Sequence, residues 1–472
     1  MKKSMFLLIA LLSVGLALPL YAIEFSFHGD LNHRFQYTNR ADFLTLDSTT
    51  VRPVINDGDV DENFGELKYR LWAEAASDDG DIKGVVGTEI GGLRFGEPGN
   101  APFSGDQVRF EVRWAYTDIQ LPMVERAARF KIGLQPFLVN KYIWQETAAG
   151  VDFTSTLGDR MDYQLAWMRG SEFDKTANRA DDDDDRTDLD AFLARLNIKP
   201  ADGTKAGAFI MYEGFDSDDN IGTVDSRDWE VKLLNTGGVP DIGFDLWSLG
   251  LDGSFEFSSF FVNWDLIYQT GEFQDVTFTD GFSGAGRTGD FDLSAYFLHF
   301  DLGAKFDKVN LTYTFWYASG DDDPADDDFN AFIATDVDMT ESITLFEGNY
   351  ADDNYFTERP YIADKGFIMN RIGLDYKTTE KLTLGGALMY MLTAEDIEYT
   401  AAAIGTPASD NELGWEIGGY AKYLLFKSVE VAVNGGYLFA GDALDAYEVP
   451  SIQDGSSDEN IFITSARVRF TF

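Results

Sequence analysis

A group of lysines and arginines lies on the polar side of segments in which polar and apolar residues alternate. Successive side chains of a β-strand point to opposite faces, so each segment predicts a strand with its cations on one face. These residues fall in the first five such segments and the last one: Arg34, Lys68, Arg70, Lys83, Arg109, Arg113, Arg129, Lys131, Arg467 and Arg469. If the last strand pairs with the first, the cations form one continuous wall. That wall could guide anions, or its cations could form ion pairs with glutamates on the same faces.

Acidic side chains that could oppose this wall follow the fifth segment. Residues 129–135 lead into 136–150, which contains Glu146, and Asp152 comes directly after it. The stretch 136–150 also carries several aromatic and aliphatic side chains, which would be costly to expose to water. We therefore expect 136–150 to pack against protein rather than to project into solvent.

Runs of aspartate separate the alternating segments, for example at 181–185 and 321–328. Carboxylate oxygens suit Ca²⁺ and Mg²⁺. The nearest approach to a calcium-binding loop starts at Asp57, but Glu62 stands where glycine is required and Lys68 where the bidentate glutamate belongs. We expect no dedicated metal site and no cofactor. Weak Ca²⁺ or Mg²⁺ binding at these acidic loops remains an alternative to a merely solvated surface.

Catalytic patterns are sparse. The chain has three histidines, His28, His33 and His299, and it contains no Gly-x-Ser-x-Gly, phosphate-loop or His-Glu-x-x-His motif. The sequence therefore predicts a protein that is not an enzyme.

The alternation that positions these residues runs through the whole chain from Glu24 onward. In the first segment Phe25, Phe27 and Phe35 share one face, while Asp30 and Arg34 share the other. Strong alternation on every strand fits a sheet between two solvents, lipid on one face and water on the other. The predicted fold is an all-β, antiparallel transmembrane barrel.

Both chain ends carry signals that agree with export to a membrane. Residues 1–22 combine Lys2 and Lys3 with an apolar run and a small-residue exit at Ala22, which predicts a cleaved signal peptide. The final segment, residues 461–472, is amphipathic and ends on Phe470 and Phe472. An amphipathic last strand that closes on a terminal aromatic resembles the C-terminal assembly signal of bacterial outer-membrane barrels.

Short turns and long connections alternate along the chain and set the expected strand number. Eight compact turns, including Asp252-Gly253, and nine longer connections predict about 18 strands, with turns on the periplasmic rim and loops outside. In region 227–252 two segments compete for one strand, so 16 strands is the alternative. Aromatic residues near strand ends, among them Trp114 and Tyr116, predict two girdles at the bilayer interfaces.

Composition limits the domain organisation and the partners. The chain has no cysteine, which excludes a disulfide framework, and no linker-like segment, so residues 23–472 are predicted to form a single domain. The formal net charge of −44 argues against nucleic acid as a partner.

The chain resembles the Gram-negative outer-membrane porin family in its terminal Phe472, its hairpin pattern and the strand that ends in Gly133-Leu134-Gln135. In that family a strand ending in Gly-Arg-Gln leads to a third loop that folds inward and constricts the pore. Leu134 stands here in place of the arginine. The resemblance implies that the segment near 136–150 folds inward. It also implies a homotrimer in contact with the lipid bilayer, lipopolysaccharide and the outer-membrane assembly machinery.

On this resemblance, four cations of the wall would face Glu146 across the narrowest section and create a transverse field. They are Arg109, Arg113, Arg129 and Lys131. The expected function is a water-filled channel for ions and small hydrophilic solutes. Two alternatives stay open: a substrate-specific channel that guides an anion along the basic wall, and a structural or adhesin barrel plugged by its loops.

Overall fold

A computed structural model describes residues 23–39, 62–96, 108, 110–122, 127–171, 189–217, 242–279, 286–323, 325–335, 341–345, 363–457 and 459–472. The predicted signal peptide, residues 1–22, lies outside these ranges, as do Arg109 and the aspartate run at 181–185. Among the residues described, no helix combines the length and apolar character needed to cross a bilayer.

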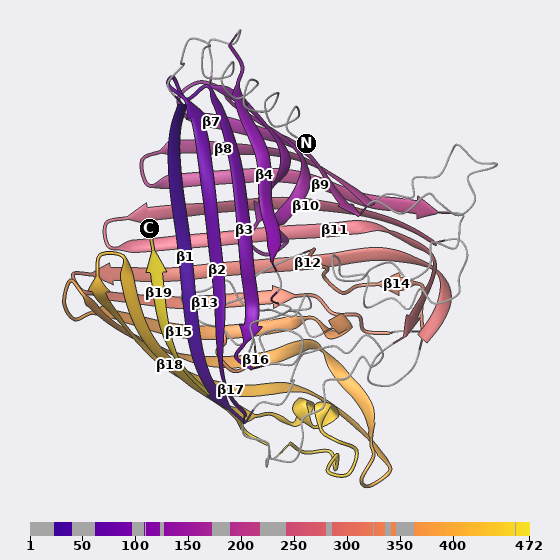
Figure 1. The fold of residues 1–472 in the computed structure, drawn as a ribbon. Helices are drawn as coiled ribbons and strands as arrows, with labels where there is room; N and C mark the ends of the chain where they lie inside the picture. Colours follow the sequence, from indigo (N-terminus) through magenta and orange to yellow (C-terminus); the bar gives the residue numbers. More distant parts are fainter. Residues whose placement is uncertain are drawn as a thin grey trace, which may run out of the picture.

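The chain forms one antiparallel sheet of 18 long strands that closes into a barrel (Figure 1). The long strands are β1 (Ile23–Thr38), β2 (Glu62–Ser77), β3 (Ile82–Arg94), β4 (Glu111–Gln120), β5 (Ala128–Asn140), β6 (Trp144–Thr156), β7 (Met161–Ser171), β8 (Leu189–Ala201), β9 (Thr204–Ser217), β10 (Ile242–Phe257), β11 (Phe260–Thr279), β12 (Gly286–Phe306), β13 (Val309–Ala318), β15 (Phe367–Lys377), β16 (Leu382–Ala401), β17 (Thr406–Phe426), β18 (Val429–Ala440) and β19 (Ile461–Thr471). The remaining elements are short: β14 (Asp328–Phe329), which pairs in parallel with β12, and the 3₁₀ helices η3 (Ala363–Lys365) and η4 (Asp442–Tyr447). The prediction of 18 strands is confirmed.

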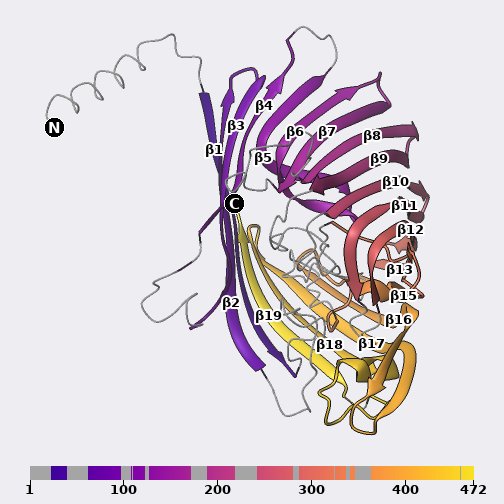
Figure 2. The same ribbon diagram turned by 90° about the vertical axis from the view of Figure 1, so that its right-hand side faces the viewer.

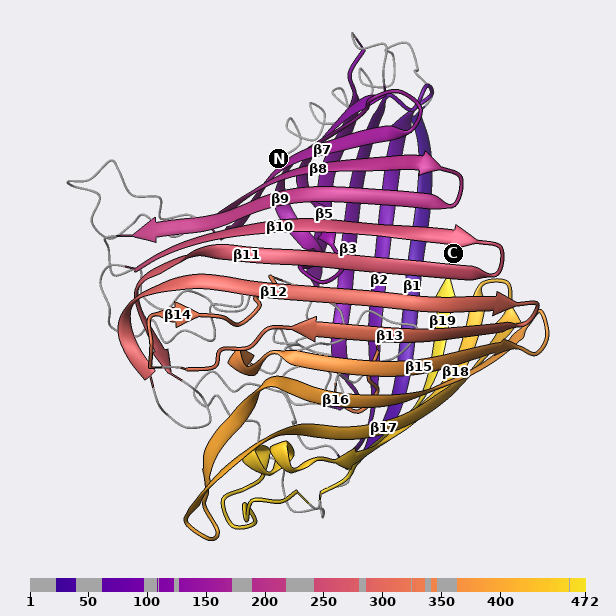
Figure 3. The same ribbon diagram turned by 180° about the vertical axis from the view of Figure 1, so that it is seen from behind.

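Strand tilt is visible in the way the two sides of the barrel cross. In Figure 1 the front wall, β1 to β4, runs steeply across the rear wall, which Figure 3 shows from behind as β7 to β17. A closed barrel requires such tilted strands, because the register must shift around the circumference.

The barrel closes where the last strand meets the first. β19 pairs with β1 in a register that sets Phe470 beside Leu31 and Arg467 beside Arg34. Phe472 and Gly29 then exchange two backbone hydrogen bonds of 3.0 Å. A Cβ atom on Gly29 would lie 2.3 Å from the Phe472 ring, so the glycine leaves room for the terminal aromatic at the seam. Figure 2 shows the C-terminus against β1.

Most connections divide into a rim of turns and a rim of longer loops, as predicted, but on the loop rim β5 and β6 are joined only by 141–143 and β16 and β17 only by 402–405. Between paired strands the turns have two to seven residues. One predicted turn is wrong: Asp252-Gly253 lies inside β10, and the chain reverses at Ser258 and Ser259, where Ser258 takes a φ of 55°. Asp252 instead accepts a 2.7 Å bond from Arg195, so pairing within the sheet overrides the local turn signal.

Alternate side chains face outward and remain exposed, although many are large and apolar. Phe27 is 70% exposed and Ile372 is 54% exposed, whereas Arg467 on the inner face is 1% exposed. This arrangement, with apolar side chains outside and charged side chains inside, is the reverse of that in a water-soluble protein. It fits a barrel surrounded by lipid.

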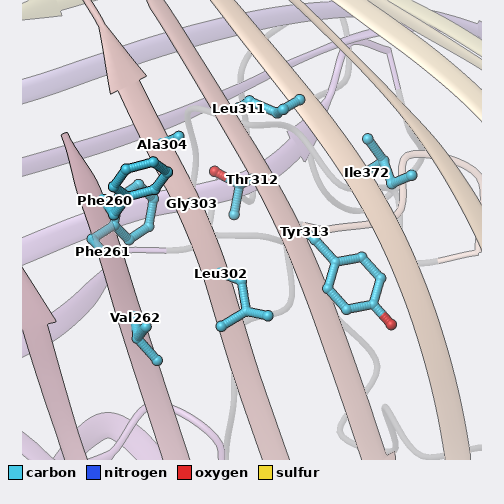
Figure 4. Close-up of a pocket in the computed structure, with 10 residues that line it drawn as sticks. All are labelled: Phe260, Phe261, Val262, Leu302, Gly303, Ala304, Leu311, Thr312, Tyr313 and Ile372. Carbon is cyan, nitrogen blue, oxygen red and sulfur yellow. The ribbon is translucent and has the colours of Figure 1, made fainter.

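Figure 4 shows a groove on this outer face, across β11, β12, β13 and β15. The groove encloses about 550 Å³ and is lined mainly by Phe260, Val262, Leu302, Ala304, Leu311, Tyr313 and Ile372. Its composition suits acyl chains of the bilayer.

One expected part of the aromatic girdles is wrong. Trp114 and Tyr116 face the lumen rather than the lipid, because β4 carries one extra residue at Arg113. Opposite this position, Gly87 pairs with Trp114 and Thr88 pairs with Val112. The resulting bulge changes which face each later residue of β4 occupies.

The facing of the strands predicts an asymmetric effect of added charge. Ile372→Arg would place a cation in the lipid-facing groove and should destabilise the barrel by about 2–4 kcal/mol. Thr383→Arg is the control, since Thr383 lies on the inner face of β16 between Lys377 and Lys422 and its replacement should cost much less. Urea unfolding in lipid vesicles measures both, and equal losses would contradict the facing.

Candidate functional site

The hairpin formed by β5 and β6 leaves the barrel wall near its loop-side end. β4 pairs with β5 only as far as Leu134, and β7 pairs with β6 only from Ala149 onward. Between these points residues 135–148 pair only with each other. Gly133 has a φ of 129°, and a Cβ there would lie 2.3 Å from the Ala115 carbonyl oxygen, so glycine permits the departure. We call residues 135–148 the inner hairpin.

The tip of the inner hairpin crosses to the opposite wall. Asn140 donates a 2.7 Å hydrogen bond to Asp265 on β11. The Tyr142 ring lies 4.7 Å from the rings of both Phe297 and His299 on β12, measured between centroids. The hairpin therefore forms a bar across the lumen, from β4 and β7 to β11 and β12.

The aromatic contact on the far wall is fixed by a polar group of three side chains. His299 Nδ1 lies 2.9 Å from Asp265, and its Nε2 lies 3.3 Å from Asp301. Asp301 also accepts a 2.7 Å bond from Thr314. Because both ring nitrogens have partners, the imidazole presents a fixed face to Tyr142.

A second segment enters the lumen from the connection between β13 and β15. We call it the inner loop; residues 319–323, 325–335 and 341–345 of it are described. The Gln269 side chain exchanges two hydrogen bonds with the backbone of Ile333, at 2.8 and 2.9 Å. The Thr335 N–H donates to the Ile143 carbonyl oxygen at 2.8 Å. The inner loop thus lies directly against the inner hairpin.

Glu416, a wholly buried residue of β17, anchors the later part of the inner loop. It accepts hydrogen bonds from the backbone N–H groups of Ile343 (2.9 Å) and Thr344 (3.1 Å). The hydroxyls of Ser342 and Thr344 donate to the same carboxylate. Four donors to one carboxylate hold the loop against this side of the barrel.

Apolar packing completes the attachment of both segments. Phe137, Val139, Ile143, Phe332 and Leu345 are each at most 3% exposed. They belong to one apolar cluster with inward-facing residues of the wall: Met168, Leu193, Phe209, Met211, Leu246, Phe297, Trp316, Met369 and Met391. The loop-side half of the lumen is therefore packed with protein along β7 to β16.

The predicted cations of the opposite wall are close to carboxylates. Glu89 alone is approached by Lys68 at 3.7 Å, Arg70 at 2.6 Å and Arg113 at 2.9 Å. Further pairs join Arg34 to Glu66, Arg129 to Asp118, Lys131 to Asp152, Lys83 to Glu74, Arg467 to Glu430 and Arg469 to Asp30. This wall is a lattice of opposite charges rather than a basic surface.

The structure brings Arg113 and Glu146, both predicted site residues, into direct contact. The Arg113 guanidinium bonds directly to Glu146 at 2.9 Å, and so joins the wall to the base of the inner hairpin. Direct contact removes the separation that a transverse field requires. Arg109 lies outside the described residues.

Exposure varies along this polar wall: the Arg94–Glu62 pair at the loop ends of β3 and β2 is 41% and 37% exposed, and the cations near the turns are also partly exposed. Near the turn rim the side chains of Lys83, Lys131 and Arg129 are 36%, 34% and 31% exposed, whereas Arg34 near the loop rim is 5% exposed. The polar wall is therefore accessible to water near the turns.

Several residues of this arrangement were not predicted from the sequence. Glu416, Asp265 and Asn140 carry no local motif, since their partners are distant in the chain. His299 was visible only as an isolated histidine. Among the residues that the structure describes, no group of three or more His, Cys, Asp or Glu side chains is arranged to hold a metal ion.

Comparison with solved structures agrees with the architecture. A crystal structure of OccK8 (OprE) from Pseudomonas aeruginosa matches with a TM-score of 0.52 at 12% identity, covering 95% of this chain and 98% of that one. OccAB4 from Acinetobacter baumannii matches with a TM-score of 0.49 at 10% identity, with 95% and 98% covered. No protein-family model and no curated protein matches the sequence. The chain therefore shares the barrel fold of the OccK8 structure.

The start of the inner loop carries an acid with an unusual pKa. Asp321 is 1% exposed, and burial, with Asp364 and Asp326 nearby, raises its pKa to about 7. A hydrogen bond from the Asn330 N–H and the nearby Lys365 act in the opposite direction. The docked loop therefore favours the protonated acid.

This shift predicts that the inner loop docks less firmly as pH rises. A raised acid pKa means that docking is strongest below the ordinary value of 3.8 and weakens as pH rises toward about 7, after which it is constant. Hydrogen exchange at amides 328–335, corrected for intrinsic rates, measures this opening. Asp321→Asn should remove the pH dependence, while Asp327→Asn, an exposed control, should retain it. A variant Asp321→Asn with unchanged pH dependence would assign the effect to another group.

Proposed function

We propose that the protein is an outer-membrane channel through which ions and small hydrophilic solutes diffuse passively. The observation that carries this proposal is the two-sided barrel, with apolar side chains toward lipid and a water-exposed lattice of charges along one side of its lumen. The inner hairpin and the inner loop narrow the passage, which favours small solutes. The similarity of fold to outer-membrane channel structures supports the same conclusion.

Two other functions make different use of the same features. A channel dedicated to anions needs cations without partners, and the described cations of the wall lie beside carboxylates. A plugged structural barrel is favoured by the apolar packing of both inner segments. Conductance separates that plugged barrel from a channel.

The surroundings of the barrel follow from the proposal. The outer face would contact the lipid bilayer and lipopolysaccharide, and assembly as a homotrimer is proposed from the porin resemblance. Delivery by the outer-membrane assembly machinery would depend on Phe470 and Phe472. We propose no role for nucleic acid, a cofactor or catalysis.

Single-channel recording tests the channel and its constriction together. The wild-type protein should give small ohmic steps in KCl. Glu416→Ala should give larger steps, because four donors lose their acceptor and the inner loop loses about 3 kcal/mol or more of anchoring. Glu398→Ala, at an exposed site of β16, is the control and should leave the steps unchanged. A folded wild-type barrel that never conducts, while Glu416→Ala does, would instead support the plugged barrel.

Assembly provides an independent test of the closing strand. Deleting Phe472 removes the ring over Gly29 and the two backbone bonds at the seam, so the amount of folded barrel in the outer membrane should fall severalfold. Replacing Phe472 with Tyr keeps an aromatic ring and should restore assembly. Heat-modifiable gel mobility measures the folded fraction. Normal assembly of the deletion would show that the terminal aromatic is dispensable.

A further inference from the structure

A row of rings lies across four adjacent strands on the inner face of the barrel. The register aligns His28 of β1 with Trp72 of β2, Trp72 with Gly87 of β3, and Gly87 with Trp114 of β4. All three rings are partly exposed. We call these four residues the aromatic row.

The rings of the aromatic row are in contact. His28 stacks on Trp72 with centroids 5.2 Å apart and planes 21° apart. Trp114 meets Trp72 edge to face at 5.5 Å. Gly87 makes this possible, because a Cβ atom there would lie 2.8 Å from the Trp114 ring. The three rings are therefore in contact, but they do not share one plane: His28 covers one face of Trp72, and the planes of Trp72 and Trp114 are 73° apart.

Polar side chains border the aromatic row on both sides. They lie two residues away along each strand, which is a distance of about 7 Å. On the loop side lie Asp30, Arg70 and Glu89, with Arg70 bonded to Glu89 at 2.6 Å. On the turn side lie Ser26, Glu74 and Tyr116, and Glu74 pairs with Lys83 at 2.9 Å. Both borders offer donors and acceptors, with each cation next to an acid.

One end of the row reaches the inner hairpin. Trp114 Nε1 donates a 3.2 Å hydrogen bond to the hydroxyl of Thr147, which lies beside Glu146. A solute that enters from the turn side along the polar wall meets these rings at the base of the hairpin, where the packed half of the lumen begins.

The chemistry of the row and its borders selects a ligand class. A pyranose has a face of C–H groups that packs on an aromatic ring, and hydroxyls around its edge that both donate and accept hydrogen bonds. A carboxylate ligand needs a cation with no acid at hand, and the borders do not supply this. The balanced borders therefore favour a ligand without net charge.

We propose that the aromatic row is a binding site for uncharged sugars, at which a pyranose packs its C–H face on one of the two indoles, touches the edge of the other, and bonds to the charged borders through its hydroxyls. This assignment rests on the proposed channel function, since the channel brings the sugar to the row. It names the solute class that the channel handles best.

Sugar binding is measured on the full-length barrel in two ways. D-Glucose and maltotriose are added to KCl-conducting channels in planar bilayers, and the reduction of current gives an association constant. Titration calorimetry on the purified barrel in detergent gives the same constant without requiring conductance. Benzoate is the carboxylate comparison for both measurements.

Variants assign the binding to the row. Trp114→Leu and Trp72→Leu should each lower the association constant about tenfold, the loss expected for one aromatic stacking contact. Trp72→Phe keeps a ring and should retain most of the binding. Trp247→Leu is the matched control, because Trp247 faces outward and is 42% exposed. Heat-modifiable gel mobility shows whether each variant is folded. If a tryptophan variant does not fold, Gly87→Val, whose side chain would displace the Trp114 ring, is tested in its place.

The outcomes for the site and for the channel are distinct. Sugar binding that falls in the row variants and not in Trp247→Leu supports the site. Absence of any sugar effect in both measurements, with normal KCl conductance, overturns the site and leaves the channel intact. Tighter binding of benzoate than of sugar also overturns it. Sugar binding by calorimetry without conductance overturns the proposed channel instead.

Discussion

Backbone N–H and C=O groups inside a bilayer have no water to bond with, and this constraint determines the rest of the structure. A sheet satisfies it only if no edge remains. Here β19 bonds to β1 from Asp30 and Thr471 to Thr38 and Ile463, so the sheet closes on itself. Closure separates lipid outside from the space within, and every strand must then have two different faces. The alternation from Glu24 to Phe472 is the consequence in the sequence.

An 18-stranded barrel encloses more space than wall side chains fill, and the chain narrows it with its own backbone. The inner hairpin and the inner loop have backbone groups that must also be satisfied. Gln269 bonds to Ile333, Thr335 bonds to Ile143, and Glu416 takes two N–H groups. Apolar packing contributes to the attachment of both segments, and these polar contacts fix where each segment lies. The lumen therefore has an apolar side and a charged side.

The strands, their number and the direction in which most side chains face could be predicted, because residues that face lipid alternate with residues that face the lumen along every strand. Features that depend on partners far along the chain could not. Asp252-Gly253 resembles a turn locally, but pairing with β9 and β11 continues through it. The face on which Trp114 lies depends on the bulge at Arg113, and the alternation of polar and apolar residues gives no sign of that bulge. Ile343 and Glu416 are 73 positions apart, and their contact leaves no pattern in either segment.

The net charge of the chain is a poor guide to the side chains that a solute meets in the lumen, and the bulge at Arg113 shows why. The bulge turns Arg113 inward beside Glu89 and Glu146, and it places Trp114 on the face that carries Trp72. The chain as a whole has a net charge of −44, yet the described wall sets cations beside acids. Paired charges produce a field that decays over a short distance, so they act on a solute in contact and little on one at a distance. Discrimination along this wall is therefore a matter of hydrogen bonding and stacking at close range, and the acidic excess elsewhere in the chain has little part in it.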